Sequence, residues 1–384
     1  MARKLGSYMQ SGPEYLHVDL NGIKKYRSCS YIDRFHLNFN GLNGHQDNCN
    51  NTGCIEFCCL SLSPGVASCN EGSESIKRIK QKRDAIIIES KLLSLNKDIG
   101  TKNNTTTCDK CPFFKERTEN GDGLIHFVNI NMYPAPCQCK CIYCGVHNSE
   151  SGIINEKSTE CYTNMFNAIQ WAESTGMIAA DAIWQVASGE IAIHPYKDKI
   201  LKLVRDKNVR ILTNSFIYDE GVAEILNENC LASINLSIDA GTSKTWNKVK
   251  GVNNFDNVLK NLEKYSACSI RPEQVTLKYI ILPGINDNLE DYQGIIDIMK
   301  QLKIKKLIIS RDNRFRIEKL IICNSYKSKP EYNNERYSVT DRAAGYLTAM
   351  LRQSGMSAEN GFFWPDDYQK ADSIANELRG LNII

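Results

Sequence analysis

The sequence lacks any long hydrophobic run and any block of like charges. No stretch approaches the roughly 18 to 20 apolar residues of a membrane-spanning helix. Residues 1–10 hold two basic residues without the apolar segment of a secretion signal. Basic residues exceed acidic ones by only three, so the charge indicates no nucleic-acid partner. These absences predict a cytoplasmic protein with neither a membrane nor a nucleic acid as its partner.

Cysteine, by contrast, is abundant, with 16 in 384 residues. That density lies below the roughly 8 to 10% of small disulfide-stabilised proteins, and a chain without an export signal stays in a reducing compartment. Thiolates there are free to bind iron or zinc. Twelve of the cysteines precede residue 145, at positions 29, 49, 54, 58, 59, 69, 108, 111, 137, 139, 141 and 144. Metal or cluster binding is therefore the leading interpretation.

From about residue 124, apolar runs of strand length alternate with helical segments, which is typical of repeated β/α units around a parallel sheet. Asp219 is predicted to cap one helix, and Asp287 with Glu290 to form the capping box of another. The pattern predicts an α/β fold with a partial (β/α)6 TIM-like barrel over residues 121–325. Its strands are expected near residues 125–132, 182–188, 210–214, 232–238, 274–282 and 305–310.

Both flanks of this barrel differ from it in pattern. Residues 1–120 are predicted to form a small cysteine-rich domain with one long helix over residues 74–96. Residues 326–384 are predicted to form a C-terminal helical extension, with a helix over residues 340–352. Its aromatic residues 362–364 are expected to cover an open side or end of the barrel.

The segment Pro134-Ala-Pro-Cys-Gln-Cys-Lys-Cys-Ile-Tyr-Cys-Gly145 follows the first predicted strand and spaces Cys137, Cys141 and Cys144 as C-x3-C-x2-C. A [4Fe-4S] cluster has four irons, so three cysteine ligands leave one iron open for chemistry. The alternative is a structural zinc site with Cys139 as the fourth ligand.

Polar side chains also mark the ends of later strands. The strand over residues 232–238 places Asn235, Ser237 and Asp239 on one face, which a buried parallel strand normally avoids. Either a ligand in the barrel lumen satisfies these groups or they bond to one another. Asn214 ends the preceding strand in the same way. Lys278 is either a lumenal cation for a carboxylate or a lysine that reaches solvent.

Together these motifs resemble the radical S-adenosylmethionine (SAM) superfamily, whose loop is C-x3-C-x-aromatic-C after the first barrel strand. Tyr143 fills the aromatic position. The segment Ala187-Ser188-Gly189-Glu190 is similar to the superfamily's Gly-Gly-Glu motif, with Ser188 in place of the first glycine. The strand ending in Ser237-Ile-Asp239 and the Pro-Gly-x-Asn-Asp turn after Ile280 are similar as well. The resemblance covers about residues 120–325.

The resemblance implies that the open iron binds SAM, whose amino group would meet Glu190 and whose adenine would meet Ile280. Ser237 would contact the ribose or the carboxylate, and Asp239 SAM or the substrate. A 5'-deoxyadenosyl radical would then take hydrogen from a sugar, small metabolite or peptide, with an electron from a donor such as flavodoxin or ferredoxin. The cofactor-binding residues implied are Tyr143, Ser188, Gly189, Glu190, Asn214, Ser237, Asp239 and Ile280.

Two cysteine pairs, Cys58-Cys59 and Cys108-x2-Cys111, stand on either side of the predicted N-terminal helix. Four thiolates can close one metal site. It is either a second [4Fe-4S] cluster that passes an electron, or a zinc or cluster site that only stabilises a small domain.

Two other functions remain open from the sequence. The chain is alternatively a radical SAM enzyme that modifies RNA, or an iron-sulfur or zinc binding module without catalytic activity. Cleavage of SAM separates the second of these from an enzyme.

Overall fold

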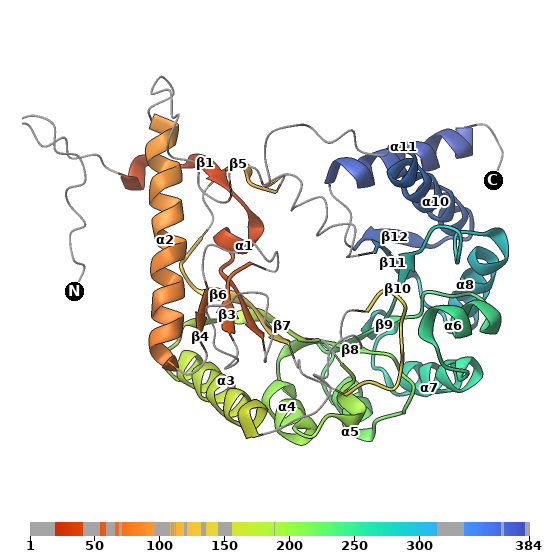
Figure 1. Cartoon of the computed structure of the whole chain (residues 1–384), viewed down its shortest axis with the longest axis horizontal. Coiled ribbons are helices and arrows are strands. Elements are labelled where there is room, and N and C mark those ends of the chain that lie inside the picture. The colour runs from red at the N-terminus through yellow and green to blue at the C-terminus, as the bar shows by residue number, and fades with distance from the viewer. Residues whose placement is uncertain are drawn as a thin grey trace, which may run out of the picture.

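A curved sheet, with helices on its outer side, forms the centre of the molecule (Figure 1). The computed structural model describes residues 20–40, 54–58, 66–68, 71–95, 108, 111, 113–118, 121–131, 136–144, 156–187, 189–312, 334–361 and 365–380. Six neighbouring strands pair in parallel and follow one another in chain order. They are β6 (Ile125–Asn131), β7 (Ile178–Ala187), β8 (Asn208–Thr213), β9 (Ser233–Ser237), β10 (Val275–Ile281) and β11 (Lys306–Arg311).

The outer face of these strands packs against helices. Aliphatic residues such as Val128, Val186, Ile211 and Leu236 are buried there in one continuous core. Alternate residues face the opposite way, into the curve of the sheet. The covering helices are α3 (Glu156–Ser174), α4 (Lys197–Val204), α5 (Glu220–Glu228), α6 (Ser243–Lys250), α7 (Phe255–Cys268) and α8 (Leu289–Gln301).

Further strands lengthen the sheet at both edges. Strand β2 (His36–Asn40) pairs in parallel with β6 and carries β3 (Cys54–Glu56) and β4 (Val66–Ser68) in antiparallel order. At the other edge β12 (Ser357–Asn360) pairs in parallel with β11. The described part of the sheet therefore has ten strands, four more than the predicted barrel units.

The remaining elements lie at the two ends of the arc (Figure 1). At the N-terminal side are α1 (Ser30–Asp33), α2 (Ser73–Leu95) and the antiparallel pair of β1 (Lys25–Ser28) and β5 (Lys115–Thr118). At the C-terminal side α10 (Asn334–Gln353) and α11 (Pro365–Gly380) pack on each other. None of the described helices is both long and apolar enough to span a membrane.

The predicted fold class is confirmed, because six parallel strands alternate with helices in an open barrel.

Asp219 caps α5 as expected, accepting a hydrogen bond from the N–H of Val222 at 3.0 Å. The predicted capping box of α8 is wrong by one residue. Asn288 caps that helix, because Asp287 accepts the N–H of Gly284 within the preceding turn. The aromatic residues 362–364 lie outside the described residues, and the division at residues 120 and 325 stays a prediction.

Candidate functional site

The cysteine loop, residues 136–144 between β6 and α3, is held by the carboxyl end of α6. The N–H of Lys140 donates to the carbonyl of Lys250 at 2.7 Å, and the N–H of Ile142 donates to that of Val249 at 3.0 Å. The last carbonyls of a helix have no partner within the helix. The cysteine loop therefore supplies hydrogen-bond donors for two of these carbonyls, and the same two hydrogen bonds fix the loop in place.

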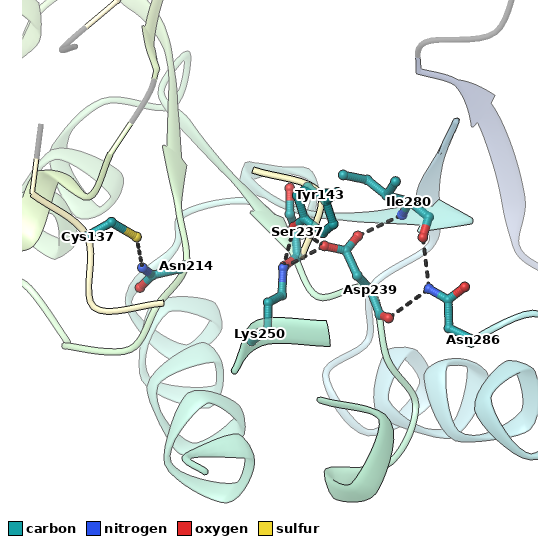
Figure 2. Close-up of polar contacts among 8 residues, drawn as sticks. All are labelled: Cys137, Tyr143, Asn214, Ser237, Asp239, Lys250, Ile280 and Asn286. Carbon is teal, nitrogen blue, oxygen red and sulfur yellow. Dashed lines mark hydrogen bonds and ion pairs between the residues drawn. The ribbon is translucent and has the colours of Figure 1, made fainter. Parts of the chain in front are cut away.

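Lys250 also holds the loop through its side chain, which is 1% exposed. Its Nζ donates to Oδ2 of Asp239 at 2.5 Å, to the Tyr143 hydroxyl at 2.7 Å and to the Ser237 carbonyl at 2.6 Å (Figure 2). The Tyr143 hydroxyl donates to the same carboxylate oxygen at 2.5 Å. A buried charge is tolerated when it is paired and hydrogen-bonded. This ion pair joins the cysteine loop to the carboxyl end of β9.

Asp239 and Asn286 join the ends of β9 and β10. Asp239 has a left-handed φ of 52°, and its Oδ1 accepts the N–H of Ile280 at 2.6 Å. The amide of Asn286 donates to the carbonyls of Asp239 and Ile280 at 2.9 and 2.8 Å (Figure 2). Both side chains are fully buried. The described contacts of Asp239 are with the protein, and its role at SAM stays a prediction.

Glu190 connects the ends of β7 and β8. Its Oε1 accepts from the Thr213 hydroxyl at 2.8 Å and from the N–H of Ala192 at 3.3 Å, and its Oε2 accepts from the N–H of Asn214 at 2.6 Å. Its own N–H donates to the carbonyl of Pro136, at the start of the cysteine loop. Burial raises the pKa of this carboxyl to about 7, against the opposing effect of its hydrogen bonds.

Asn214 and Cys139 bring hydrogen-bond donors to the sulfur atoms. Nδ2 of Asn214 donates to Sγ of Cys137 at 3.4 Å (Figure 2). Hydrogen bonding by the buried Cys139 lowers the pKa of Cys137 and lowers that of Cys141 to about 6. The thiolate is the form of cysteine that binds iron. The surroundings of the loop thus favour the thiolate form of Cys137 and Cys141.

The donor set of the loop fits a [4Fe-4S] cluster, because three thiols with C-x3-C-x2-C spacing lie on one anchored segment. The N–H of Cys144 donates to the carbonyl of Cys141 at 3.0 Å, which closes the loop into a turn. Within the described ranges, no three His, Cys, Asp or Glu side chains are grouped closely enough to hold a metal ion. Cluster binding would therefore require the three thiols to turn toward one point.

The other predicted contacts lie at the same end of the strands. Gly189 has a φ of 68°, which glycine adopts readily. Ile280 forms a small apolar cluster with Val249 and Leu282, against which Tyr143 packs. The Ser237 carbonyl is bound by Lys250, as described above. Ser188 lies outside the described residues.

Of the four predicted N-terminal metal ligands, Cys58, Cys108 and Cys111 are described and pack against the main core. The N–H of Cys111 donates to the carbonyl of Cys108 at 2.9 Å. Cys29 lies nearby, and burial raises the pKa of its thiol to about 11. Cys59 lies outside the described residues, so this site stays a prediction.

Residues 136–297, which span the cysteine loop and both strand-end clusters, match the profile of the radical SAM superfamily. The chain carries a radical SAM domain. GTP 3',8-cyclase of Clostridium acetobutylicum is 24% identical over 221 residues, covering 50% of this chain and 67% of that protein. A UPF0026 protein of Helicobacter pylori is 25% identical over 205 residues, covering 50% of this chain and 65% of that protein.

Among solved structures, the radical SAM domain and its flanks are similar to Streptococcus suis SuiB. SuiB bound to S-adenosylmethionine is 13% identical, with a TM-score of 0.46, and the match covers 75% of this chain and 56% of that chain. SuiB bound to its precursor peptide SuiA is 14% identical, with a TM-score of 0.47 and coverage of 77% and 56%. The chain spans little more than half of SuiB and about two thirds of the two curated relatives.

The prediction of a radical SAM enzyme is confirmed at the level of the superfamily, which implies SAM and a [4Fe-4S] cluster as cofactors. Sequence reasoning missed Lys250 and Thr213, and it gave Asn286 no role beyond its place in the Pro-Gly-x-Asn-Asp turn, although these three residues hold the site together. One signal for Lys250 was available, since it lies on the stripe of α6 that buries Trp246 and Val249. A lysine on the apolar side of a helix is expected to have a buried partner.

Proposed function

We propose that this protein cleaves SAM reductively at a [4Fe-4S] cluster bound by Cys137, Cys141 and Cys144, and uses the resulting radical to take hydrogen from a substrate in the barrel. The observation that supports this most is the attachment of the cysteine loop to α6 and β9 through Lys250, beside Glu190 and Asn214. When bound, the cluster supplies the electron that breaks the C5'–S bond of SAM.

The protein's own groups then hold and orient SAM. Oε2 of Glu190 accepts one hydrogen bond, so one lone pair remains for an ammonium group, whose charge would lower the pKa of the carboxyl again. Ile280, with Val249 and Leu282, offers an apolar surface for the adenine. Ser237 at the end of β9 would face the ribose or carboxylate, and the buried Asp239, whose oxygens accept from Lys250, Tyr143 and the N–H of Ile280, would hold the neighbouring turn in place. Holding the reacting carbon close to one C–H bond and excluding water are the protein's part in the reaction.

The substrate we favour is a small molecule such as a sugar or metabolite, as one relative is named for a reaction of GTP. A peptide is the second candidate. We further propose that a flavodoxin or ferredoxin supplies the electron in the cytoplasm. Cys58, Cys59, Cys108 and Cys111 would hold a second [4Fe-4S] cluster or a zinc ion in a small N-terminal domain.

The test is anaerobic reconstitution with iron and sulfide, followed by SAM and dithionite and detection of 5'-deoxyadenosine by mass spectrometry. We expect cleavage in the wild type and none in Cys141→Ala. The control is Cys230→Ala, because Cys230 is exposed and outside the cysteine loop. About eight irons per chain, rather than four, would add the N-terminal cluster.

Cleavage that survives in Cys141→Ala would refute the ligand assignment. Bound zinc without any cleavage in the wild type would instead favour the module without catalytic activity. An effect of Cys230→Ala equal to that of Cys141→Ala would show that the loss comes from misfolding, so the ligand assignment would lose its support.

A further inference from the structure

A row of polar side chains crosses five neighbouring parallel strands on the face turned away from the helices. The strand registers place its members directly side by side. Their neighbours along each strand, such as Leu37, Val128 and Val209, are buried in the core on the other face. The row consists of Asn38 (β2), Asn129 (β6), Gln185 (β7), Arg210 (β8) and Ser233 (β9).

Three amides of this row form a chain that ends in an unpartnered buried atom. Nε2 of Gln185 donates to Oδ1 of Asn129, and Nδ2 of Asn129 donates to Oδ1 of Asn38, both at 3.2 Å. Nδ2 of Asn38 has no hydrogen-bond partner, although its side chain is only 3% exposed. A buried donor without a partner costs about 1 to 3 kcal/mol. The end of the chain is therefore suited to a ligand with a hydrogen-bonding group.

Arg210 continues the row as a cation. Among the described residues its guanidinium has no hydrogen bond or ion pair, and its register partners are the neutral Gln185 and Ser233. None of the five side chains of the row is a carboxylate, and the next register partner beyond Asn38, the buried Glu56 of β3, lies four strands away from Arg210. A half-buried guanidinium among neutral amides attracts an anion, and its planar fork suits a phosphate or a carboxylate.

One layer nearer the carboxyl ends of the strands, Oδ1 of Asn235 is also buried without a partner. It lies in register with Leu212 of β8, two residues beyond Arg210. Asn214, beside Cys137, is four residues beyond Arg210, or about 13 Å along an extended strand. A ligand of about nucleotide size would thus span from Arg210 to the cysteine loop.

We propose that the row binds the anionic group of a small organic substrate, a phosphate or a carboxylate, at Arg210. The amides from Asn38 to Gln185 bind its neutral polar groups, and the reactive C–H bond then lies toward the cysteine loop. This inference gives the substrate class for the function proposed above and rests on it. Binding of an anion at Arg210, however, can be measured without SAM cleavage.

The test is labelling of arginines with phenylglyoxal in the reconstituted protein, followed by peptide mapping by mass spectrometry. Labelling is compared in chloride, inorganic phosphate and acetate at equal ionic strength. We expect one of the two anions to slow labelling of Arg210 about tenfold when present at roughly tenfold its dissociation constant, because only the unoccupied fraction reacts. The matched control is Arg342, an exposed arginine of α10. Protection by phosphate alone or by acetate alone identifies the anionic group.

Three results would overturn the proposal: no labelling of Arg210 in chloride, labelling that neither anion slows, or equal protection of Arg342. Arg210→Gln and Arg342→Gln complete the design, with binding of the protecting anion measured by calorimetry. We expect at least tenfold weaker binding in Arg210→Gln alone, and unchanged binding in that variant would also overturn the proposal. If an anion protects Arg210 but the protein does not cleave SAM, the proposed anion site is supported and the proposed function is refuted.

Discussion

His36 illustrates, at the scale of single residues, how burial sets a charge state. It begins β2, where its ring stacks on Phe127 with centroids 4.6 Å apart and meets the Tyr31 ring at 4.5 Å. Burial lowers the pKa of His36 to about 3, and the nearby Arg34 and His126 act in the same direction. The folded protein therefore keeps this imidazole neutral at a pH where the unfolded chain protonates it.

Because His36 stays neutral in the folded protein, we expect the free energy of unfolding to decrease as the pH falls. Because the folded pKa lies below the unfolded value of 6.5, the contribution to stability is complete above pH 6.5 and is lost as the pH falls toward 3. Between pH 7 and pH 5 the wild type should lose about 1 to 2 kcal/mol more free energy of unfolding than His36→Phe. Urea unfolding at both pH values measures this difference. Equal losses in the two proteins would contradict the assignment.

Helix α6 acts, at the scale of elements, as the clamp of the cysteine loop. Replacing Lys250 with Met leaves Asp239 as a buried carboxylate without its cation, which costs roughly 3 to 5 kcal/mol. We expect a lower melting temperature and less iron retained on reconstitution. Lys248→Met is the control, because Lys248 lies on the exposed side of the same helix. Equal iron content in the two variants would show that the clamp is not needed for the cluster.

Helix α8 packs closely against the turn after β9, where Gly294 of the helix lies against Gly241 of the turn. A Cβ on Gly294 would lie 2.3 Å from the carbonyl oxygen of Gly241. Glycine to alanine normally stabilises a helix interior by about 1 kcal/mol, but this crowding reverses the sign. We expect Gly294→Ala to lower the free energy of unfolding by about 3 kcal/mol. Gly380→Ala, in α11 with no neighbouring atom in reach, should change it little. Chemical denaturation of both variants tests this, and a Gly294→Ala variant as stable as the wild type would rule out the close packing.

What the sequence could predict at this scale follows from local signals. The alternation of apolar runs and helical segments predicted the six strands. Asp219 predicted the start of a helix, because a helix cap involves residues that are close in sequence. The partners of Lys250 and Asn286 were not found, since they are distant in sequence and only the fold brings them together. The cap of α8 was misplaced because Asn288 and Asp287 are both good capping residues. Only the turn geometry decides between them.

At the scale of the whole molecule, the sheet extends beyond the barrel through short strands that carry little periodicity. Strand β2 pairs with residues of β6 that lie 91 positions later in the chain, as in His36 beside Phe127. Three- to five-residue strands such as β3 and β12 are too short for a pattern of alternation to stand out. Helix α11 was likewise not predicted. These parts depend on the six-strand core for their position, so the sequence alone could not place them.

The C-terminal helices are joined to the barrel by a buried ion cluster. Arg311, the last residue of β11, pairs with Asp341 of α10 and, at 3.6 Å, with Asp367 of α11. All three side chains are at most 6% exposed. These contacts indicate that Arg311 holds the C-terminal extension on the barrel.

Removing this cation should loosen the extension before the barrel. Arg311→Leu removes the cation that pairs with the buried carboxylates of Asp341 and Asp367, which costs roughly 3 to 5 kcal/mol. Amide hydrogen exchange should therefore quicken in β12 and α11 while α4 and α5 keep their protection. Arg352→Leu is the matched control, because its pair with Asp372 also joins α10 to α11 but is about a third exposed, and such pairs contribute about 1 kcal/mol or less. If exchange rises equally in α5 and α11, the extension unfolds with the barrel as one unit. If exchange changes in neither α5 nor α11, the ion cluster is not what holds the extension.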